Sequence, residues 1–304
     1  MNRILLTGKN GQVGWELQRS LAAFGQVVAV DSDDMDLADP DAIRQVVRDV
    51  TPTVIVNPAA YTAVDKAESE PELAMAVNGA APGVLAEEAK RIGAMLVHFS
   101  TDYVFDGTKA APYAEDDAPN PQSVYGRTKL AGEEAIRATG GTHLILRTSW
   151  VYGVHGGNFV KTMLRLARER SELRIVADQF GAPTWARDLA QATASALASW
   201  QKSGWDQSLG GLYHLTGAGR TNWHHYAEEI FRLAREYDAV LAAKQLGIHP
   251  IATHEYPVPA KRPANSVLAN DKIARTFGIK LPEWQDSLAE CIRLIYEQAG
   301  LSAR

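Results

Sequence analysis

The sequence predicts an α/β fold with a doubly wound parallel sheet, followed by a smaller and more irregular C-terminal lobe. Short apolar segments of strand length alternate with amphipathic helical segments from the N-terminus to about residue 153. Such alternation is typical of a parallel sheet that is covered by helices on both faces. Beyond this point the rhythm changes, and the last third is interrupted by Pro257, Pro259 and Pro263.

A glycine turn joins the first strand to the first helix. An apolar strand at 4–7 and an amphipathic helix at 15–24 flank three glycines at three-residue intervals, Gly8, Gly11 and Gly14. Glycine permits the tight turn and lets backbone N–H groups approach a pyrophosphate at the helix N-terminus. A second strand ends in Asp31, about 20 residues on, where a carboxylate can accept from a ribose hydroxyl. This context predicts a Rossmann-like dinucleotide-binding fold, and the alternative is a purely structural turn.

The remaining elements continue the alternation. We expect further strands at 54–57, 95–105, 144–148, 173–176 and 211–215, and helices at 40–50, 68–92, 159–170 and 187–200. We assign residues 1–153 to a dinucleotide-binding domain, to which the chain returns at about 185–216. Residues 154–184 and 217–304 are assigned to a substrate-binding lobe.

Composition and charge exclude several classes of function. A net charge of −5 and a pI near 5.9 argue against a protein that binds nucleic acid by neutralising phosphates. The single cysteine, Cys291, excludes an internal disulfide and a multi-cysteine zinc site. Met1-Asn2-Arg3 runs directly into an apolar strand without a signal-peptide layout, and no apolar run approaches the ~20 residues that span a bilayer. We therefore expect a cytoplasmic protein with a small-molecule substrate and no membrane or nucleic-acid partner.

Tyr125 and Lys129 form a candidate acid/base pair. They lie four residues apart, so they share one face of a helix. A phenol has an ordinary pKa of about 10, and a neighbouring ammonium stabilises the phenolate and lowers that pKa. The spacing alone is common on solvated helix faces. The carboxyl end of the strand that ends in Ser100-Thr101 faces the same crevice as the glycine turn. Together, this strand end, the glycine turn and the Tyr125/Lys129 pair predict an active site in that crevice.

Other polar residues have a structural interpretation. His98 lies mid-strand among apolar residues, so we expect a hydrogen-bonded core histidine. Asn78 is either a helix-surface amide or a site-facing one. His224 and His225 are adjacent and lack the spacing of metal ligands, which favours polar residues at the start of a helix.

Three motifs together resemble the extended short-chain dehydrogenase/reductases: the glycine turn, the strand-end Ser100-Thr101, and Tyr125-x-x-x-Lys129. Further segments resemble the dTDP-4-dehydrorhamnose reductase family within that group, and the similarity covers nearly the whole chain. These segments are 8–14, 64–68, 100–105, 147–152, 178–184, 213–215 and 262–263.

The resemblance implies a reaction and roles for individual residues. It implies reduction of the 4-keto group of dTDP-4-dehydro-β-L-rhamnose to dTDP-L-rhamnose, with hydride from NADPH or NADH. Tyr125 would donate the proton, Lys129 would hold the nicotinamide ribose and lower the Tyr125 pKa, and Thr101 would hydrogen-bond the reacting oxygen. The implied sugar-nucleotide contacts are Thr101, Asp102 and Trp150. The implied cofactor contacts are Gly8, Gly11, Gln12, Val13, Asp31, Asp36, Leu37, Ala60, Tyr61, Thr62, Tyr125 and Lys129.

Cofactor preference, metal content and oligomeric state stay open at this point. Asp31 favours a free 2′-hydroxyl and hence NADH, whereas the resemblance includes enzymes that accept NADPH. Some relatives bind Mg²⁺ at a dimer interface, and Glu16 matches their first acidic position. Arg187 stands where that pattern has a glutamate, and a cation cannot ligate Mg²⁺, so a metal-bridged dimer is disfavoured. The expected assembly is a monomer or a homodimer.

Two alternatives remain, besides a sugar-nucleotide reductase or epimerase of another specificity. A sugar-nucleotide 4,6-dehydratase shares the fold and the Tyr/Lys pair, but the resembling dehydratases carry Asp-Glu where this chain has Asp102-Tyr103. A non-catalytic NAD(P)-binding subunit, similar to the regulatory subunit of methionine adenosyltransferase, would not need the set Thr101, Tyr125 and Lys129.

Overall fold

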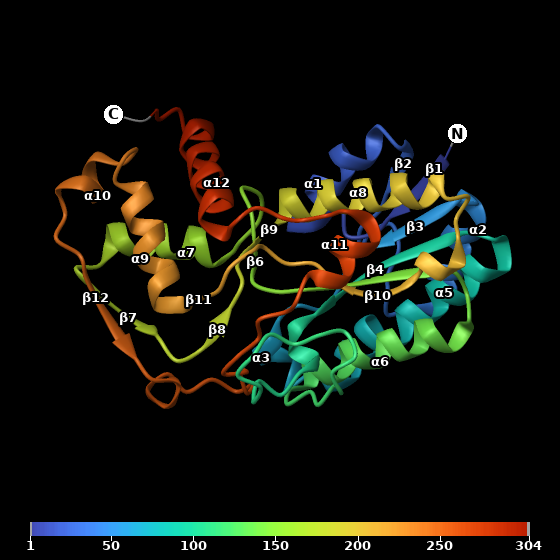
Figure 1. The fold of residues 1–304 in the computed structure, drawn as a ribbon, viewed down its shortest axis with the longest axis horizontal. Coiled ribbons are helices and arrows are strands. Elements are labelled where there is room, and N and C mark those ends of the chain that lie inside the picture. Colours follow the sequence, from blue (N-terminus) through green and yellow to red (C-terminus); the bar gives the residue numbers. More distant parts are fainter. Residues whose placement is uncertain (1, 303–304) are drawn as a thin grey trace.

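A six-stranded parallel sheet forms the centre of the computed structural model, which describes residues 2–302 (Figure 1). From edge to edge the strands are β10 (Gly211–His214), β5 (His143–Thr148), β4 (Met95–Thr101), β3 (Val54–Asn57), β1 (Asn2–Leu6) and β2 (Gly25–Ala29). Every neighbouring pair is parallel. The chain leaves β1 first toward β2 and then toward β3, so the switch point where such sheets bind ligands lies at the carboxyl end of β1.

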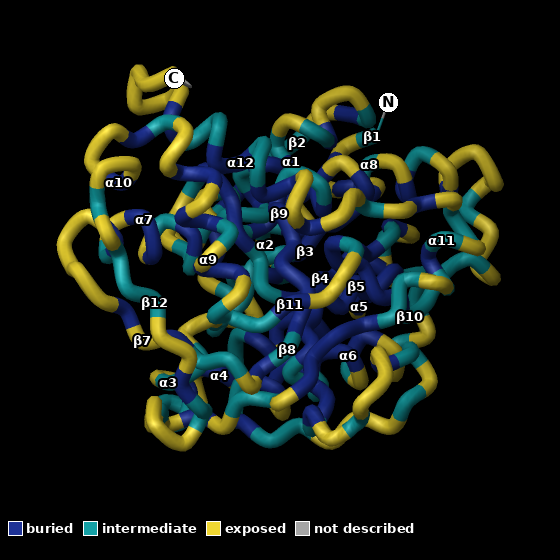
Figure 2. Tube along the Cα trace, turned by 60° about the vertical axis from the view of Figure 1, so that its left-hand side comes forward, coloured by how far each residue is buried: buried dark blue, intermediate teal, exposed yellow. Residues whose placement is uncertain are grey.

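Two layers of helices cover the sheet because successive apolar side chains along its strands point to opposite faces. Ile4 and Leu6 face one layer, and Leu5 between them faces the other. The first layer contains α1 (Gln12–Ala22), α8 (Ala186–Lys202) and α11 (Asp271–Phe277), and the second contains α2 (Pro40–Val50), α5 (Ala81–Ile92) and α6 (Val124–Thr139). In Figure 1, α1 and α8 lie above the sheet and α5 and α6 below it. The central strands are the buried interior (Figure 2). The predicted doubly wound fold is confirmed.

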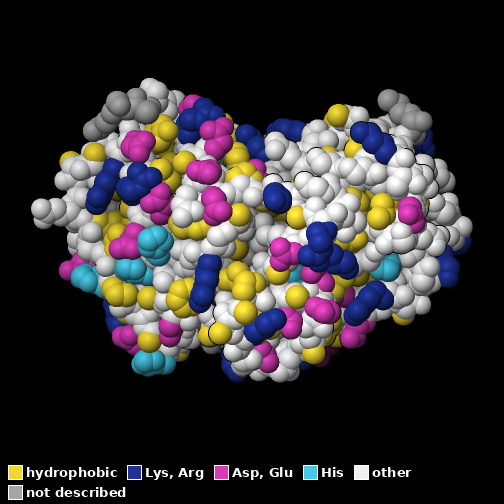
Figure 3. All heavy atoms as spheres, in the orientation of Figure 1, with side chains coloured by type: hydrophobic (Ala, Val, Ile, Leu, Met, Phe, Trp, Pro, Cys, Tyr) yellow, Lys and Arg dark blue, Asp and Glu magenta, His cyan; other side chains and the backbone are white. Residues whose placement is uncertain are grey.

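A second region with its own hydrophobic core lies beside the carboxyl ends of the strands (Figure 1). Its larger elements are α7 (Phe159–Glu169), α9 (Trp223–Ala234), α10 (Ala239–Ala243), α12 (Trp284–Gln298) and the parallel pair β7 (Glu172–Val176) and β12 (Gly247–Ile251). Two short pairs connect it to the sheet region: β6 (Val151–Tyr152) with β9 (Thr184–Trp185), and β8 (Phe180–Gly181) with β11 (Thr221–Asn222). Basic and acidic side chains are interspersed over one face of both regions (Figure 3).

Three expectations about local structure need correction. The strand expected at 95–105 ends at Thr101, and a 3-10 turn (Asp102–Val104) follows it. The helix expected at 68–92 is divided into α4 (Pro71–Met75), a π-helical turn (Ala76–Ala80) and α5, and the short α3 (Val64–Ala67) precedes it. Pro71 starts α4 because it lacks an N–H and suits a first helical position. In the C-terminal third only the proline-rich stretch 252–270 is largely irregular, since α9 and α12 are regular helices. None of the helices in residues 2–302 has the length and apolar character needed to span a bilayer.

Candidate active site

The glycine turn forms a backbone cradle at the start of α1. Gly8 adopts φ +60°, and the Gly11 N–H donates to the Gly8 carbonyl at 3.0 Å. A Cβ atom on Gly14 would lie 2.0 Å from that same carbonyl oxygen, so only glycine allows α1 to pack this closely. The turn therefore has the shape that a pyrophosphate needs at the N-terminus of a helix.

A cavity of about 160 Å³ adjoins the turn at the carboxyl ends of β1 and β2. Five of the residues predicted to contact a cofactor line it: Gly8, Asp31, Asp36, Leu37 and Ala60. The carboxylate of Asp31 accepts from the backbone N–H of Asn10 and of Ser32, each at 2.9 Å. This cavity therefore brings five of the expected cofactor residues together beside the glycine cradle.

The other predicted cofactor residues lie outside this cavity. Gln12 points toward residues 151–158, where its Nε2 donates to the Val151 carbonyl at 3.4 Å and its Oε1 accepts from Asn158 at 3.0 Å. Val13 packs against the apolar layer under α1. The Tyr61 hydroxyl donates to Glu70 at 2.6 Å. Thr62 is exposed. Gln12 and Tyr61 are therefore already hydrogen-bonded within the chain.

Thr101 and Tyr125 meet because the start of α6 packs against the turn after β4. The Ser123 hydroxyl caps α6 by accepting from the Gly126 N–H at 3.1 Å. A Cβ on Gly126 would lie 2.2 Å from the Tyr103 carbonyl oxygen, so glycine permits this close approach. The rings of Tyr103 and Tyr125 pack edge to face at 5.5 Å between centroids. These contacts place Tyr125, the first residue of the candidate acid/base pair, at the carboxyl edge of the sheet.

Burial is the main cause of the pKa shifts of Tyr125 and Lys129. It raises the pKa of Tyr125 to about 12, and Asp102 adds to the rise while hydrogen bonding with Thr101 opposes it. Burial also lowers the pKa of Lys129 to about 8, against the opposing influence of Glu133. In the free chain the Tyr125 pKa is thus raised, and its lowering by Lys129 stays a prediction for the complex with cofactor. The Lys129 Nζ instead donates to the Phe99 carbonyl at 2.6 Å.

The residues predicted to bind the sugar nucleotide lie at the ends of β4 and β5. The Thr101 hydroxyl donates to Asp102 Oδ1 at 3.0 Å, and burial raises the pKa of Asp102 to about 6. Thr101 pairs with Thr148 in the sheet register, which places Trp150 just beyond the same edge. Trp150 has φ +47°, and its ring stacks on Trp223 at 3.5 Å. Trp150 therefore lies between the sheet and the second region.

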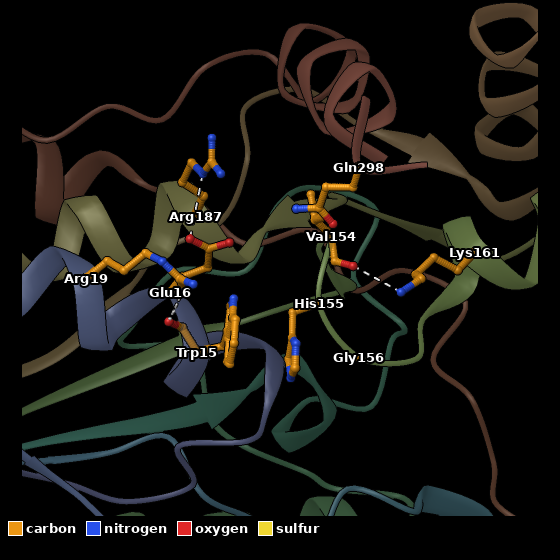
Figure 4. Close-up of a pocket in the computed structure, with 9 residues that line it drawn as sticks. All are labelled: Trp15, Glu16, Arg19, Val154, His155, Gly156, Lys161, Arg187 and Gln298. Atoms are coloured by element: carbon orange, nitrogen blue, oxygen red, sulfur yellow. Dashed lines mark hydrogen bonds and ion pairs between the residues drawn. The ribbon is translucent and has the colours of Figure 1, made fainter. Parts of the chain in front are cut away.

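Glu16, which matches the first acidic position of the Mg²⁺-binding relatives, lines a cavity beside α1. A cavity of about 390 Å³ is lined by Trp15, Glu16, Arg19, Val154, His155, Gly156, Lys161, Arg187 and Gln298 (Figure 4). Among the described residues that line it, Glu16 is the only carboxylate, and Arg187 approaches Glu16 to 3.7 Å. Within residues 2–302 no group of three or more His, Cys, Asp or Glu side chains could hold a metal ion. Arg187, the charged residue beside Glu16, is a cation and cannot ligate Mg²⁺.

Two buried polar contacts around the site were not predicted. Arg147 pairs with Glu133 at 2.6 Å, and both side chains are almost inaccessible to solvent. His98 is buried and hydrogen-bonded as expected, but its Nε2 lies 3.2 Å from Lys129 Nζ. The sequence carried a signal for the Arg147–Glu133 pair, because a charged residue within the apolar strand 144–148 needs a buried partner. Asn78 is also buried, and it hydrogen-bonds both the N–H and the carbonyl of Tyr61.

Comparison with known proteins identifies the family. The family model described as RmlD substrate binding domain matches residues 1–297. The dTDP-4-dehydrorhamnose reductase of Burkholderia thailandensis is 52% identical over 97% of this chain and 100% of its own length. The structure of a dTDP-4-dehydrorhamnose reductase from Clostridium acetobutylicum superimposes with a TM-score of 0.87 at 40% identity, covering 96% and 99% of the two chains. That of the Bacillus anthracis reductase, in complex with NADP, gives 0.84 at 35% identity, covering 95% and 98%. The chain therefore belongs to the dTDP-4-dehydrorhamnose reductase family.

Proposed function

We propose that the chain reduces the 4-keto group of dTDP-4-dehydro-β-L-rhamnose to dTDP-L-rhamnose with NADPH or NADH. The observation that carries this proposal is the convergence of Thr101, Tyr125 and Lys129 on the sheet edge that also holds the glycine turn. Membership of the family supports the identity of the substrate. The sheet and its two helical layers would bind the dinucleotide, and the region around α9 and α12 would bind the sugar nucleotide.

A bound nicotinamide dinucleotide supplies the hydride, and the residues of the chain supply the proton and the orientation. At neutral pH Tyr125 is protonated, because its pKa is about 12, so it can donate to the alkoxide that develops at C4. Thr101 lies beside Tyr125, and its hydroxyl, which donates to Asp102 in the free chain, would turn to donate to the same oxygen. Lys129 would leave the Phe99 carbonyl to hold the nicotinamide ribose, and its ammonium would then favour proton release from Tyr125.

Both nicotinamide cofactors are accepted in this proposal. Asp31 offers a carboxylate to a 2′-hydroxyl, whereas Lys9, the next residue after Gly8, offers a cation to a 2′-phosphate. The Lys9 ammonium is held by Asp34 at 2.5 Å. Asp34→Asn should therefore raise kcat/KM for NADPH relative to NADH, and an unchanged ratio would contradict a role for Lys9. We further propose that no Mg²⁺ bridges two chains through Glu16, since Arg187 occupies its neighbourhood.

The test is an assay of purified protein with dTDP-4-dehydrorhamnose that follows NAD(P)H absorbance. Oxidation of either cofactor supports the proposal, and no oxidation with both would contradict it. A parallel incubation with dTDP-glucose tests for dehydratase activity, which Tyr103 disfavours because its ring packs on Tyr125 where a base would be needed. Stable co-purification with a synthetase, without turnover, would support a regulatory subunit instead.

A further inference from the structure

A buried chain of polar side chains leads from Lys129 to the glycine turn. Lys129 Nζ lies 3.2 Å from His98 Nε2, and His98 Nδ1 lies 3.0 Å from Asn57 Nδ2. The Thr7 hydroxyl donates to Asn57 Oδ1 at 2.6 Å, and the Ala59 N–H donates to the Thr7 oxygen at 3.3 Å. Lys129, His98, Asn57 and Thr7 each expose 1% of their surface or less. This series of hydrogen bonds crosses β4, β3 and β1 and ends one residue before Gly8.

The direction of these hydrogen bonds fixes where protons lie. Since Asn57 Nδ2 can only donate, His98 Nδ1 accepts, and the proton of a neutral imidazole is then on Nε2. That N–H points at Lys129, which can accept it only as a neutral amine. Lys129 in turn donates one of its N–H groups to the Phe99 carbonyl. With the Asn57 amide in this orientation, the hydrogen bonds suit a neutral Lys129.

A reversed arrangement suits a charged Lys129, although the Thr7 hydroxyl then gives up the hydrogen bond that it donates to Asn57. An ammonium donates to His98 Nε2, which moves the imidazole proton to Nδ1. The Asn57 amide then turns by half a rotation, so that its oxygen accepts from His98 and its nitrogen donates to Thr7. The Thr7 oxygen has two lone pairs and accepts from both Asn57 and Ala59. The two arrangements occupy the same space and differ only in proton positions and in the orientation of one amide.

We propose that His98, oriented by Asn57, is a positioning residue for Lys129 and that its tautomer changes together with the charge on Lys129. Burial keeps the pKa of His98 well below its ordinary value, so the ring stays neutral and can accept from an ammonium. No other part of the chain contributes a hydrogen-bonding side chain to Lys129 among the described residues. The proposal deepens the proposed function, on which its activity readout rests.

Within residues 2–302, the surrounding charged groups do not provide an alternative partner for Lys129. The elements packed against α6 bring charged or titratable groups near the pair, but each is engaged elsewhere. They are Glu133 on α6 and Arg147 on β5, which pair with each other; Asp102 after β4, which faces Thr101 and Tyr125; and Glu68 after α3, which accepts from the Val124 N–H. Tyr125, on α6 itself, adds no charge near neutral pH.

The direct test observes the tautomer without any turnover. Protein with ¹⁵N-labelled histidine is titrated from about pH 6 to pH 10, and two-bond ¹H–¹⁵N correlations assign the proton on His98, identified by the His98→Gln spectrum. The proposal predicts Nδ1–H at the acid end and Nε2–H at the alkaline end. An invariant tautomer across a range in which the Lys129 side chain, ¹³C-labelled at Cε, titrates would overturn it.

Kinetics provide the second test. The pH profile of kcat/KM reports the free enzyme, and its alkaline limb marks the loss of the Lys129 ammonium. Since hydrogen bonds favour a charged group more than a neutral one, His98→Leu should move this limb by about one pH unit toward neutrality. His98→Gln, which restores an acceptor, should move it back. The matched control is His214→Leu, another buried histidine, which should leave the limb in place.

The outcomes separate this inference from the proposed function. A limb that stays in place in His98→Leu would overturn the inference even in an active reductase. A tautomer change in a protein that oxidises no NAD(P)H would support the inference and contradict the proposed function. If His98→Leu does not fold, the titration of the unmodified protein still decides the question.

Discussion

Helix α6 buries two oppositely charged residues one turn apart, and their surroundings differ. Glu133 accepts from Arg147 at 2.8 and 2.6 Å and from Ser100 at 2.5 Å. Lys129 has only a backbone carbonyl and a neutral ring nitrogen as hydrogen-bond partners among the described residues. A fully paired buried charge is held in one state, whereas an unpaired one has a shifted pKa and can change state. The Glu133 side of α6 therefore fixes the helix, and the Lys129 side is available for chemistry.

Among the tests of this contrast between Lys129 and Glu133, replacing Lys129 has the largest expected effect. Lys129→Met removes a poorly paired cation, so turnover should fall by about 10²–10⁴-fold while stability is kept or increased. Steady-state kinetics and urea unfolding measure the two quantities. Lys202→Met, at the exposed end of α8, is the control and should change neither. A variant that loses several kcal/mol of stability would show that Lys129 is mainly structural.

Glu133→Gln should give the opposite pattern. It leaves Arg147 buried without a countercharge, which costs about 3–5 kcal/mol in the free energy of unfolding. Glu169→Gln breaks the exposed pair with Arg165 and should cost at most about 0.5 kcal/mol. Equal effects of the two substitutions on urea unfolding would refute the distinction between the two sides of α6.

The pH dependence of stability provides a third test. The pKa of Lys129 is about 8 in the folded chain and near its ordinary 10.5 when unfolded, so between these values the unfolded chain holds the extra proton. Stability from this residue therefore rises with pH in that window. Relative to Lys129→Met, the unmodified chain should gain about 1–3 kcal/mol from pH 8 to pH 10. A constant difference would mean that the Lys129 pKa is not lowered.

Among these tests, Ser100→Ala has the smallest expected effect. It removes one donor from Glu133 but leaves Arg147, so we expect a loss of about 1.5 kcal/mol in unfolding free energy. Ser195→Ala, on the exposed face of α8, should stay within about 0.5 kcal/mol. A loss for Ser100→Ala no larger than for this control would show that Arg147 alone satisfies Glu133.

Much of the fold was predictable because its signals are local. The alternation of strands and helices, the glycine turn at Gly8 and the Asp39 cap of α2 all depend on neighbouring residues. Within the site, the sequence placed Thr101, Tyr125 and Lys129 at one sheet edge. The partners of Lys129 were not predictable, because His98 meets Lys129, and Asn57 meets His98, only after β3, β4 and α6 have packed. The same holds for the raised Tyr125 pKa, which depends on burial.

The central claim is that Tyr125 is the proton donor in a nicotinamide-dependent reduction. The most direct test compares Tyr125→Phe with the unmodified chain in turnover of dTDP-4-dehydrorhamnose and in affinity for NADPH. We predict that turnover falls by about 10²-fold or more while cofactor affinity is kept, since the phenol contributes the proton and little binding. A variant that keeps most of its turnover would contradict the claim and assign the proton to another group.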